Sequence, residues 1–260
     1  RRAMQHNTTY TLLFAVAVCG VCSIFVSGAA VSLKDRQVAN ALLDKQKKVL
    51  GVTGLLKAGE EPTPEQVAQI FETSIRPKLI DLKTGNYAEG DAETFDQIKA
   101  SKDPERSKAA PDNPAKVPRL PHQALVYQVV KGDDVQMLVL PVEGKGLWSP
   151  LYGFLALDKD VNTIKGLTFY QHAETPGLGG EVDNPKWKGL WPGRKAFDDA
   201  GKPKIEVIKG QAGPVAEDPY RVDGLSGATI TARGVSYLVQ FWLGDHGFGP
   251  YLKQFKERGS

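Results

Sequence analysis

Residues 226–229 read Ser-Gly-Ala-Thr and stand directly before a predicted helix over 231–243. A helix N-terminus presents unpaired backbone N–H groups and a partial positive charge, which together bind phosphate. The glycine and alanine let an anion approach the backbone closely, and the hydroxyls of Ser226 and Thr229 add donors. The run therefore indicates a phosphate-binding turn with a nucleophilic hydroxyl at its edge. A tight turn capped by Thr231 explains the same residues without a ligand, and the residues alone leave both interpretations open.

A serine hydrolase is a third interpretation of this stretch. Residues 224–228 read Gly-Leu-Ser-Gly-Ala, which departs from the G-x-S-x-G nucleophile elbow only at its last position. That chemistry needs a histidine base and an acid that orients it. His246 is the only histidine downstream, and no acid is obviously placed to orient it. We therefore disfavour a hydrolase.

A second informative stretch, residues 172–180, reads His-Ala-Glu-Thr-Pro-Gly-Leu-Gly-Gly and follows a predicted strand. Its proline and glycines favour a loop. On an exposed loop, Glu174 and Thr175 offer an acceptor and a donor for the edge of a flat heteroaromatic ring, and Leu178 suits the face of that ring. An ordinary wide loop is the alternative. Trp148 is a further candidate for contact with such a ring, although a lone tryptophan is more often buried in a core.

The elements that position these two stretches are predicted from hydrophobic periodicity. Five strands are expected, at 124–130, 135–142, 152–158, 163–172 and 205–209. The first four form two hairpins, because a short polar turn separates the members of each pair. The helix over 231–243 follows, with Gly244 as its stop signal. Strands in a run and then a closing helix indicate an α+β domain with an antiparallel or mixed sheet and flanking helices.

The N-terminal part of the chain is predicted to be a membrane anchor. Residues 10–31 are uncharged, and a spanning helix needs roughly 20 apolar residues. A cleavable signal peptide, the alternative, has a shorter apolar core. We expect the anchor helix to continue over 33–50, where apolar residues recur at helical spacing.

A second helix is predicted to begin at a capping box formed by Thr63 and Gln66. It runs towards Ile75, and we expect Pro77 to end or kink it. Residues 101–121 contain five prolines and few large apolar side chains, so they are expected to form a loop or boundary.

Composition disfavours several classes of function. The net charge is only +3, and the basic residues are scattered among acids, so nothing indicates nucleic-acid binding. Cys19 and Cys22 both lie in the apolar stretch, where thiols are more often small fillers than a redox pair. The four histidines are dispersed, so there is no metal-site pattern. No G-x-G-x-x-G after a strand and no P-loop is present, which argues against a nicotinamide or ATP site.

Two motifs together resemble a known family. Residues 223–229, DGLSGAT, resemble the attachment motif of FMN-binding domains, in which the flavin phosphate is joined to the last threonine. Residues 172–180 resemble the flavin-contacting loop of the same domains. With residues 144–158, the apolar N-terminal stretch and the chain length of 260 residues, they are similar to the NqrC family of the sodium-translocating NADH:quinone oxidoreductases. The alternatives are the G subunit of an Rnf-type complex and a membrane-anchored binding or assembly protein without a redox role.

The resemblance implies a covalent cofactor. FMN would be joined through a phosphoester, a phosphothreonine linkage, to Thr229 by a separate flavin transferase that uses FAD. The chain would relay electrons without being an independent catalyst, because the cofactor carries the chemistry and the protein sets its position and potential. The cofactor-binding residues implied are Ser226, Gly227, Ala228, Thr229, Glu174, Thr175, Gly177, Leu178, Trp148 and Lys209.

The resemblance also implies a cellular setting. The chain would be a single-pass protein of the bacterial inner membrane with a periplasmic domain, and its partners would be membrane lipid and the other five subunits of the complex. A count of charges places the domain on the cytoplasmic side instead, because the basic residues after the anchor outnumber Arg1 and Arg2. The expected divisions are 1–32 for the N-terminal segment and anchor, 33–120 for a helical and proline-rich region, 121–248 for an FMN-binding domain, and 249–260 for a tail whose final Arg-Gly-Ser resembles a vector remnant.

Overall fold

A computed structural model describes residues 8–56, 59–60 and 62–258. The chain divides into two compact units, Arg1–Asp44 and Lys45–Ser260. Helix α1 (Thr8–Val52) forms the described part of the first unit and continues into the second. Its most apolar window has a mean hydropathy of 2.4, so the helix is long and apolar enough to cross a membrane. The expected continuation of the anchor helix over 33–50 is confirmed, and Arg1 and Arg2 lie outside the described residues.

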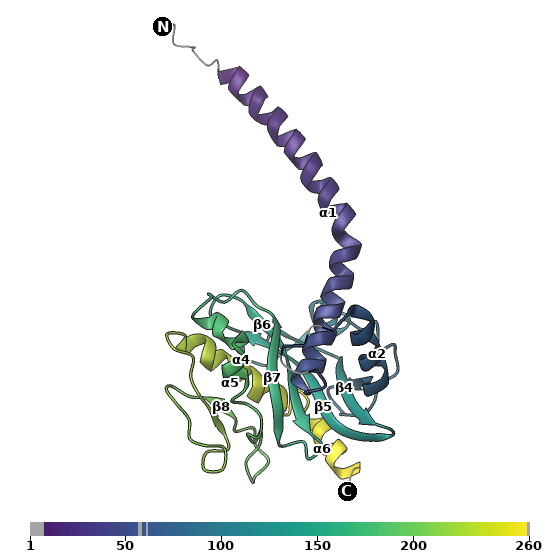
Figure 1. The fold of residues 1–260 in the computed structure, drawn as a ribbon, viewed down its shortest axis with the longest axis vertical. Helices are drawn as coiled ribbons and strands as arrows, with labels where there is room; N and C mark the ends of the chain where they lie inside the picture. The colour runs from purple at the N-terminus through teal and green to yellow at the C-terminus, as the bar shows by residue number, and fades with distance from the viewer. Residues whose placement is uncertain (1–7, 57–58, 61, 259–260) are drawn as a thin grey trace. The chain divides into compact units, whose positions relative to one another are not determined.

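The second unit is built on a five-stranded antiparallel sheet in the order β1-β4-β5-β6-β7 (Figure 1). The strands are β1 (Ile75–Asp81), β4 (Gln123–Lys131), β5 (Asp134–Lys145), β6 (Pro150–Asp158) and β7 (Ile164–Gln171). Both expected hairpins are confirmed, as β4 pairs with β5 and β6 with β7. The α+β class with a sheet and flanking helices is therefore confirmed.

Helix α2 (Pro64–Ser74) begins at the expected capping box. The N–H of Gln66 donates to Thr63 Oγ1 at 3.3 Å, and the N–H of Thr63 donates to Gln66 Oε1 at 2.9 Å. The helix ends at Ser74 with Ile75 as its C-cap, so the expected end near Ile75 is confirmed, and Pro77 does not form a kink within the helix. Pro77 lies instead inside β1, which is an edge strand, where a missing N–H is tolerated. This strand comes from before the expected boundary at residue 120 and joins the same sheet as β4–β7.

The other elements of this unit are short. They are α3 (Gln97–Lys102), β2 (Ser107–Ala109), β3 (Arg119–Pro121), the 3-10 helix η1 (Gly179–Asp183), α4 (Pro185–Lys188), β8 (Glu206–Val207), β9 (Arg221–Val222) and α6 (Gly249–Arg258). The strand expected at 205–209 is only β8, which pairs in parallel with β9 outside the main sheet. In the expected tail, α6 buries Tyr251 and Leu252, whereas Gly259 and Ser260 lie outside the described residues.

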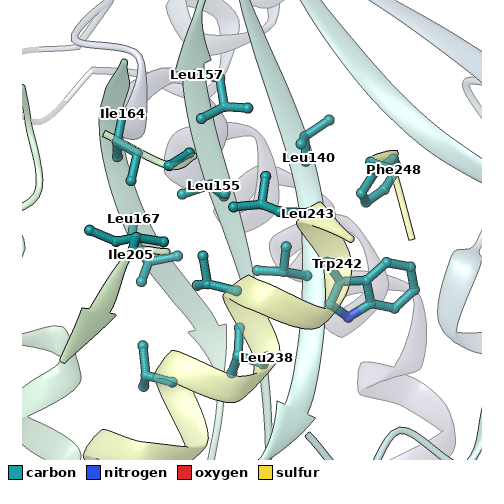
Figure 2. Packing of buried hydrophobic residues seen from close by; sticks show 14 of the residues in the cluster. Leu140, Leu155, Leu157, Ile164, Leu167, Ile205, Leu238, Trp242, Leu243 and Phe248 are labelled. Carbon is teal, nitrogen blue, oxygen red and sulfur yellow. The ribbon is translucent and has the colours of Figure 1, made fainter. Parts of the chain in front are cut away.

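Helix α5 (Thr229–Leu243) packs its apolar face on the sheet and ends at Gly244, as expected. Figure 2 shows the side chains of this interface, including Leu140, Leu155, Leu157, Ile164, Leu167, Ile205, Leu238, Trp242, Leu243 and Phe248. Two glycines allow a close approach: a Cβ on Gly144 would lie 2.5 Å from Leu238 Cβ, and one on Gly234 would lie 2.4 Å from the carbonyl oxygen of Lys145. These contacts set the middle of α5 against the end of β5.

We expect Leu155→Ala to lower the free energy of unfolding by about 2–5 kcal/mol, because Leu155 is fully buried between the sheet and α5 and the surroundings close only partly over the lost methyl groups. The matched control is Leu55→Ala, because Leu55 is 36% exposed. This substitution should lower the free energy of unfolding by less than about 1 kcal/mol. Urea unfolding of both variants measures the difference. Equal losses would show that this core does not stabilise the unit as described.

Candidate functional site

The SGAT run forms the turn into α5, and the helix begins earlier than expected. Its N-cap is Ala228, so the expectation that Thr231 caps the helix is wrong; Thr231 lies in the first turn. Ala228 makes no side-chain cap hydrogen bond. The N–H groups of the first turn therefore receive no acceptor from an N-cap side chain, and an anion at this end would accept from them.

A cavity of about 600 Å³ opens beside this turn. Two segments line it, 207–211 around β8 and 223–233 around the start of α5. Of the residues expected to bind a cofactor, it brings together Ser226, Gly227, Thr229 and Lys209. The hydroxyl-bearing residues and Lys209 are exposed. Its volume lies within the range of small-molecule sites, which is roughly 300–1,000 Å³.

Arg233 also lines this cavity and was missed by the sequence reasoning. It lies four residues after Thr229 on α5, and side chains at this spacing share one face of a helix. That spacing was the available signal, but it became useful only once the helix was known to begin at Thr229. With Lys209 and Arg233 the cavity carries two cations beside a helix N-terminus, which suits a phosphate group.

Leu178 joins the second motif to the SGAT turn. Gly227 has φ +70°, a conformation that favours glycine. A Cβ at this position would lie 2.9 Å from Leu178 Cδ2, so the leucine side chain packs against the turn. Leu178 nonetheless keeps 44% of its surface exposed, which leaves an apolar face available beside the cavity.

The Glu174 carboxylate holds three segments together. Its oxygens accept four hydrogen bonds, from the backbone N–H groups of Leu147 at 3.2 Å, Trp148 at 2.9 Å and Ser149 at 3.2 Å and from the hydroxyl of Thr231 at 2.6 Å. Two glycines leave room for it, since a Cβ on Gly146 or Gly179 would lie 2.6 or 2.7 Å from its oxygens. One side chain thus joins the loop after β5, the loop after β7 and the first turn of α5.

Glu174 is buried, with only 5% of the residue exposed. The expectation that it offers an acceptor on an exposed loop is therefore wrong. Burial raises the pKa of its carboxyl, but the hydrogen bonds from Thr231 and from the three backbone N–H groups outweigh that effect. The net pKa therefore lies below the ordinary value of 4.5. Glu174 is ionised at neutral pH, and its acceptor capacity is used by the protein itself.

The remaining predicted residues lie around this network, and the described residues that line the cavity do not include them. The carbonyl of Thr175 accepts from the N–H groups of Leu178 at 3.1 Å and Gly180 at 2.9 Å, and Gly177 has φ +75°, so these residues shape a turn. Trp148 is 67% exposed, so the interpretation of this tryptophan as core is wrong. Its backbone is held by Glu174 while its ring is left to solvent.

Comparisons with known proteins agree with this geometry. A model of the FMN-binding domain matches residues 146–244, which contain both motifs and Arg233. The C subunit of the Na⁺-translocating NADH-quinone reductase of Vibrio anguillarum is 47% identical over 96% of this chain and 95% of its own. The chain belongs to the NqrC family. The family member from Pseudomonas aeruginosa is 46% identical over 98% of both chains.

The fold agrees with the same family. The crystal structure of Shewanella oneidensis NqrC matches with a TM-score of 0.77 and 37% identity over 84% of this chain and 99% of its own. The resemblance based on the two motifs is therefore confirmed. Membership in the NqrC family and the FMN-binding domain support FMN as the cofactor and electron transfer as the role.

Proposed function

We propose that the chain carries FMN in a phosphoester bond to Thr229 and relays electrons within the membrane reductase. The observation that carries the proposal is the cavity at the start of α5, where Thr229 lies with Lys209 and Arg233. The exposed Thr229 lies in the same cavity as two cations and a helix N-terminus, a combination that favours an esterified phosphate. FMN, when bound, supplies the reversible transfer of electrons.

The residues of the turn have distinct roles in this proposal. Lys209 and Arg233 neutralise the phosphate, and the first-turn N–H groups of α5 donate to its oxygens. Ser226 adds a hydroxyl donor, while Gly227 keeps the backbone accessible and the buried Ala228 serves as the N-cap of α5. The flavin transferase forms the bond between Thr229 Oγ1 and phosphorus and breaks the pyrophosphate of FAD. AMP leaves, and the hydroxyl proton passes to the transferase or to water.

The flavin ring is proposed to lie against the exposed faces of Leu178 and Trp148 and the turn at Thr175–Gly177. Leu178 contributes an apolar surface next to the SGAT turn, and Trp148 contributes a large aromatic one. Glu174 has no oxygen to spare for the ring, because four protein donors already use its carboxylate. Its role is to hold the loops that carry the flavin contacts.

The cellular arrangement is also a proposal. Helix α1 anchors the chain in the bacterial inner membrane, and the domain lies in the periplasm next to the other five subunits. The excess of basic residues after the apolar stretch is compatible with this orientation, because large domains translocate largely regardless of charge. Proteolysis of the domain in spheroplasts, with the membrane intact, tests it; protection of the domain would place it in the cytoplasm.

The intact mass of the purified chain after denaturation tests the covalent bond. We expect an added mass of one FMN less one water, fluorescence on a denaturing gel, and a fragment that assigns the modification to the peptide holding Thr229. A bare polypeptide mass from cells that also express the transferase would contradict the proposal. The transferase is required in this control because the chain does not make the bond alone.

Arg233→Gln is expected to slow flavin attachment about tenfold, because the cation that faces the phosphate is lost while the site stays partly hydrated. The rate of appearance of in-gel fluorescence with purified transferase and FAD measures the effect. The matched control is Lys253→Gln, which removes an exposed cation on α6 outside the cavity. Equal rates for both variants would exclude a role of Arg233 in phosphate binding.

A further inference from the structure

A second cavity, of about 280 Å³, lies away from the SGAT turn and shares no lining residue with the first. It is lined by the end of α3, by the segment leading into β3, and by the facing ends of β5 and β6. None of the residues expected to bind FMN contributes to it. Its function is therefore a separate question from flavin attachment.

The charged side chains that line this cavity are mostly cationic. Lys102, Lys116, Arg119 and Lys145 line it, and Glu143 is its one carboxylate among the described residues. Arg119 is already engaged, because its guanidinium donates to the Ser107 hydroxyl and carbonyl oxygens at 2.8 Å each.

The lysines of the lining differ in their partners. Lys116 forms an exposed pair with Asp112 at 3.6 Å. Within the described part of the chain, Lys102 and Lys145 form no ion pair, so two cations at the cavity are available to an anion.

Glu143 is the unusual member of the lining. It lies on β5 directly opposite Tyr152 of β6, and no described residue forms a hydrogen bond with its carboxyl group. Burial raises the pKa of this carboxyl to about 7, against the lowering effect of Lys102. The charged and titratable groups around it are Lys102 from α3, Lys116 and Arg119 from the segment at β3, Lys145 from β5, Tyr152 from β6 and Tyr170 from β7.

We infer that this cavity binds a small organic carboxylate, held by Lys102 and Lys145 and by a hydrogen bond from the protonated Glu143 carboxyl. A hydrogen bond from a carboxylic acid to a carboxylate is of the strong, charge-assisted kind. Val117, Pro118 and Pro150 supply apolar walls for the carbon body of such a ligand, which inorganic phosphate cannot use. Above pH 7, binding takes up one proton from solvent, because the ionised Glu143 would repel the anion.

The test is a titration of the full-length, flavin-loaded protein with ¹³C-labelled butyrate, followed by NMR at pH 6, 7 and 8. If only the protonated site binds, the dissociation constant rises about tenfold between pH 6 and pH 8. No saturable binding at pH 6 would overturn the inference. Tighter binding of inorganic phosphate than of butyrate would also overturn it, because the site would then be a phosphate site.

Two variants separate the proton-linked site from a general surface attraction. Glu143→Gln places a neutral donor at the same position, so butyrate should bind equally at pH 6 and pH 8. Lys102→Gln should weaken binding at pH 6 at least fivefold, whereas Lys108→Gln, an exposed lysine of β2 outside the cavity, should leave it unchanged. A pH dependence that persists in Glu143→Gln, or equal binding by the two lysine variants, would contradict the assignment.

Discussion

Thr229→Ala is expected to remove the proposed covalent flavin completely while leaving the domain folded. The alanine side chain has no oxygen that could be joined to phosphorus, so the phosphoester cannot form at this position. Thr229 is exposed at the first position of α5, and alanine is a good helix former there. The free energy of unfolding should therefore change by less than about 0.5 kcal/mol. Intact mass, in-gel fluorescence and thermal unfolding of the same sample measure both outcomes.

Ser226→Ala is the matched control for the proposed attachment residue, Thr229. Ser226 carries the other exposed hydroxyl of the SGAT turn and lines the same cavity. This variant should keep the covalent flavin, with a lower rate of attachment because one donor to the phosphate is lost. Flavin that survives in Thr229→Ala but disappears in Ser226→Ala would assign the bond to Ser226 instead.

Glu174→Gln is expected to destabilise the domain by about 3 kcal/mol, because a buried carboxylate that accepts four hydrogen bonds is replaced by an amide. The amide has one acceptor oxygen and turns an NH₂ group towards protein donors. The three segments that Glu174 joins should loosen together, so the turn before α5 should also become more accessible. Urea unfolding gives the stability, and hydrogen exchange at residues 146–149 reports the local opening.

Low pH should reproduce part of this loss of stability in the protein without the Glu174→Gln substitution. Because the pKa of Glu174 is lower in the folded state than its ordinary value of 4.5, its ionised form stabilises the fold above that value. This stabilisation is lost as the pH falls below 4.5 through the folded-state pKa. The Glu174→Gln variant should not show this acid-dependent loss of stability, whereas the exposed control Glu217→Gln should still show it. Identical pH profiles for the two variants would show that Glu174 is not the group responsible.

Local structure followed from the sequence where neighbouring residues decide it. The capping box at Thr63, the two hairpins and the stop at Gly244 depend on residues within a few positions of each other, and all are confirmed. Strand β1 was missed because it lies directly after a helix and contains Pro77, and only its pairing with β4 makes it a strand. The helix start was misplaced because Thr231 is a favourable cap by type, whereas its hydroxyl donates to Glu174 instead.

Residue types and their order were enough to predict a candidate phosphate-binding turn at the SGAT run, and the resemblance of this run and the loop at 172–180 to FMN-binding domains predicted a flavin site. How these residues are used depends on the folded domain. The fold buries Glu174 as the acceptor for donors from two other segments, exposes Trp148 and brings Lys209 to the same cavity as Arg233. These properties depend on contacts between residues far apart in the chain. The packing of α5 on the sheet creates these contacts, so no local pattern of residues could reveal the properties.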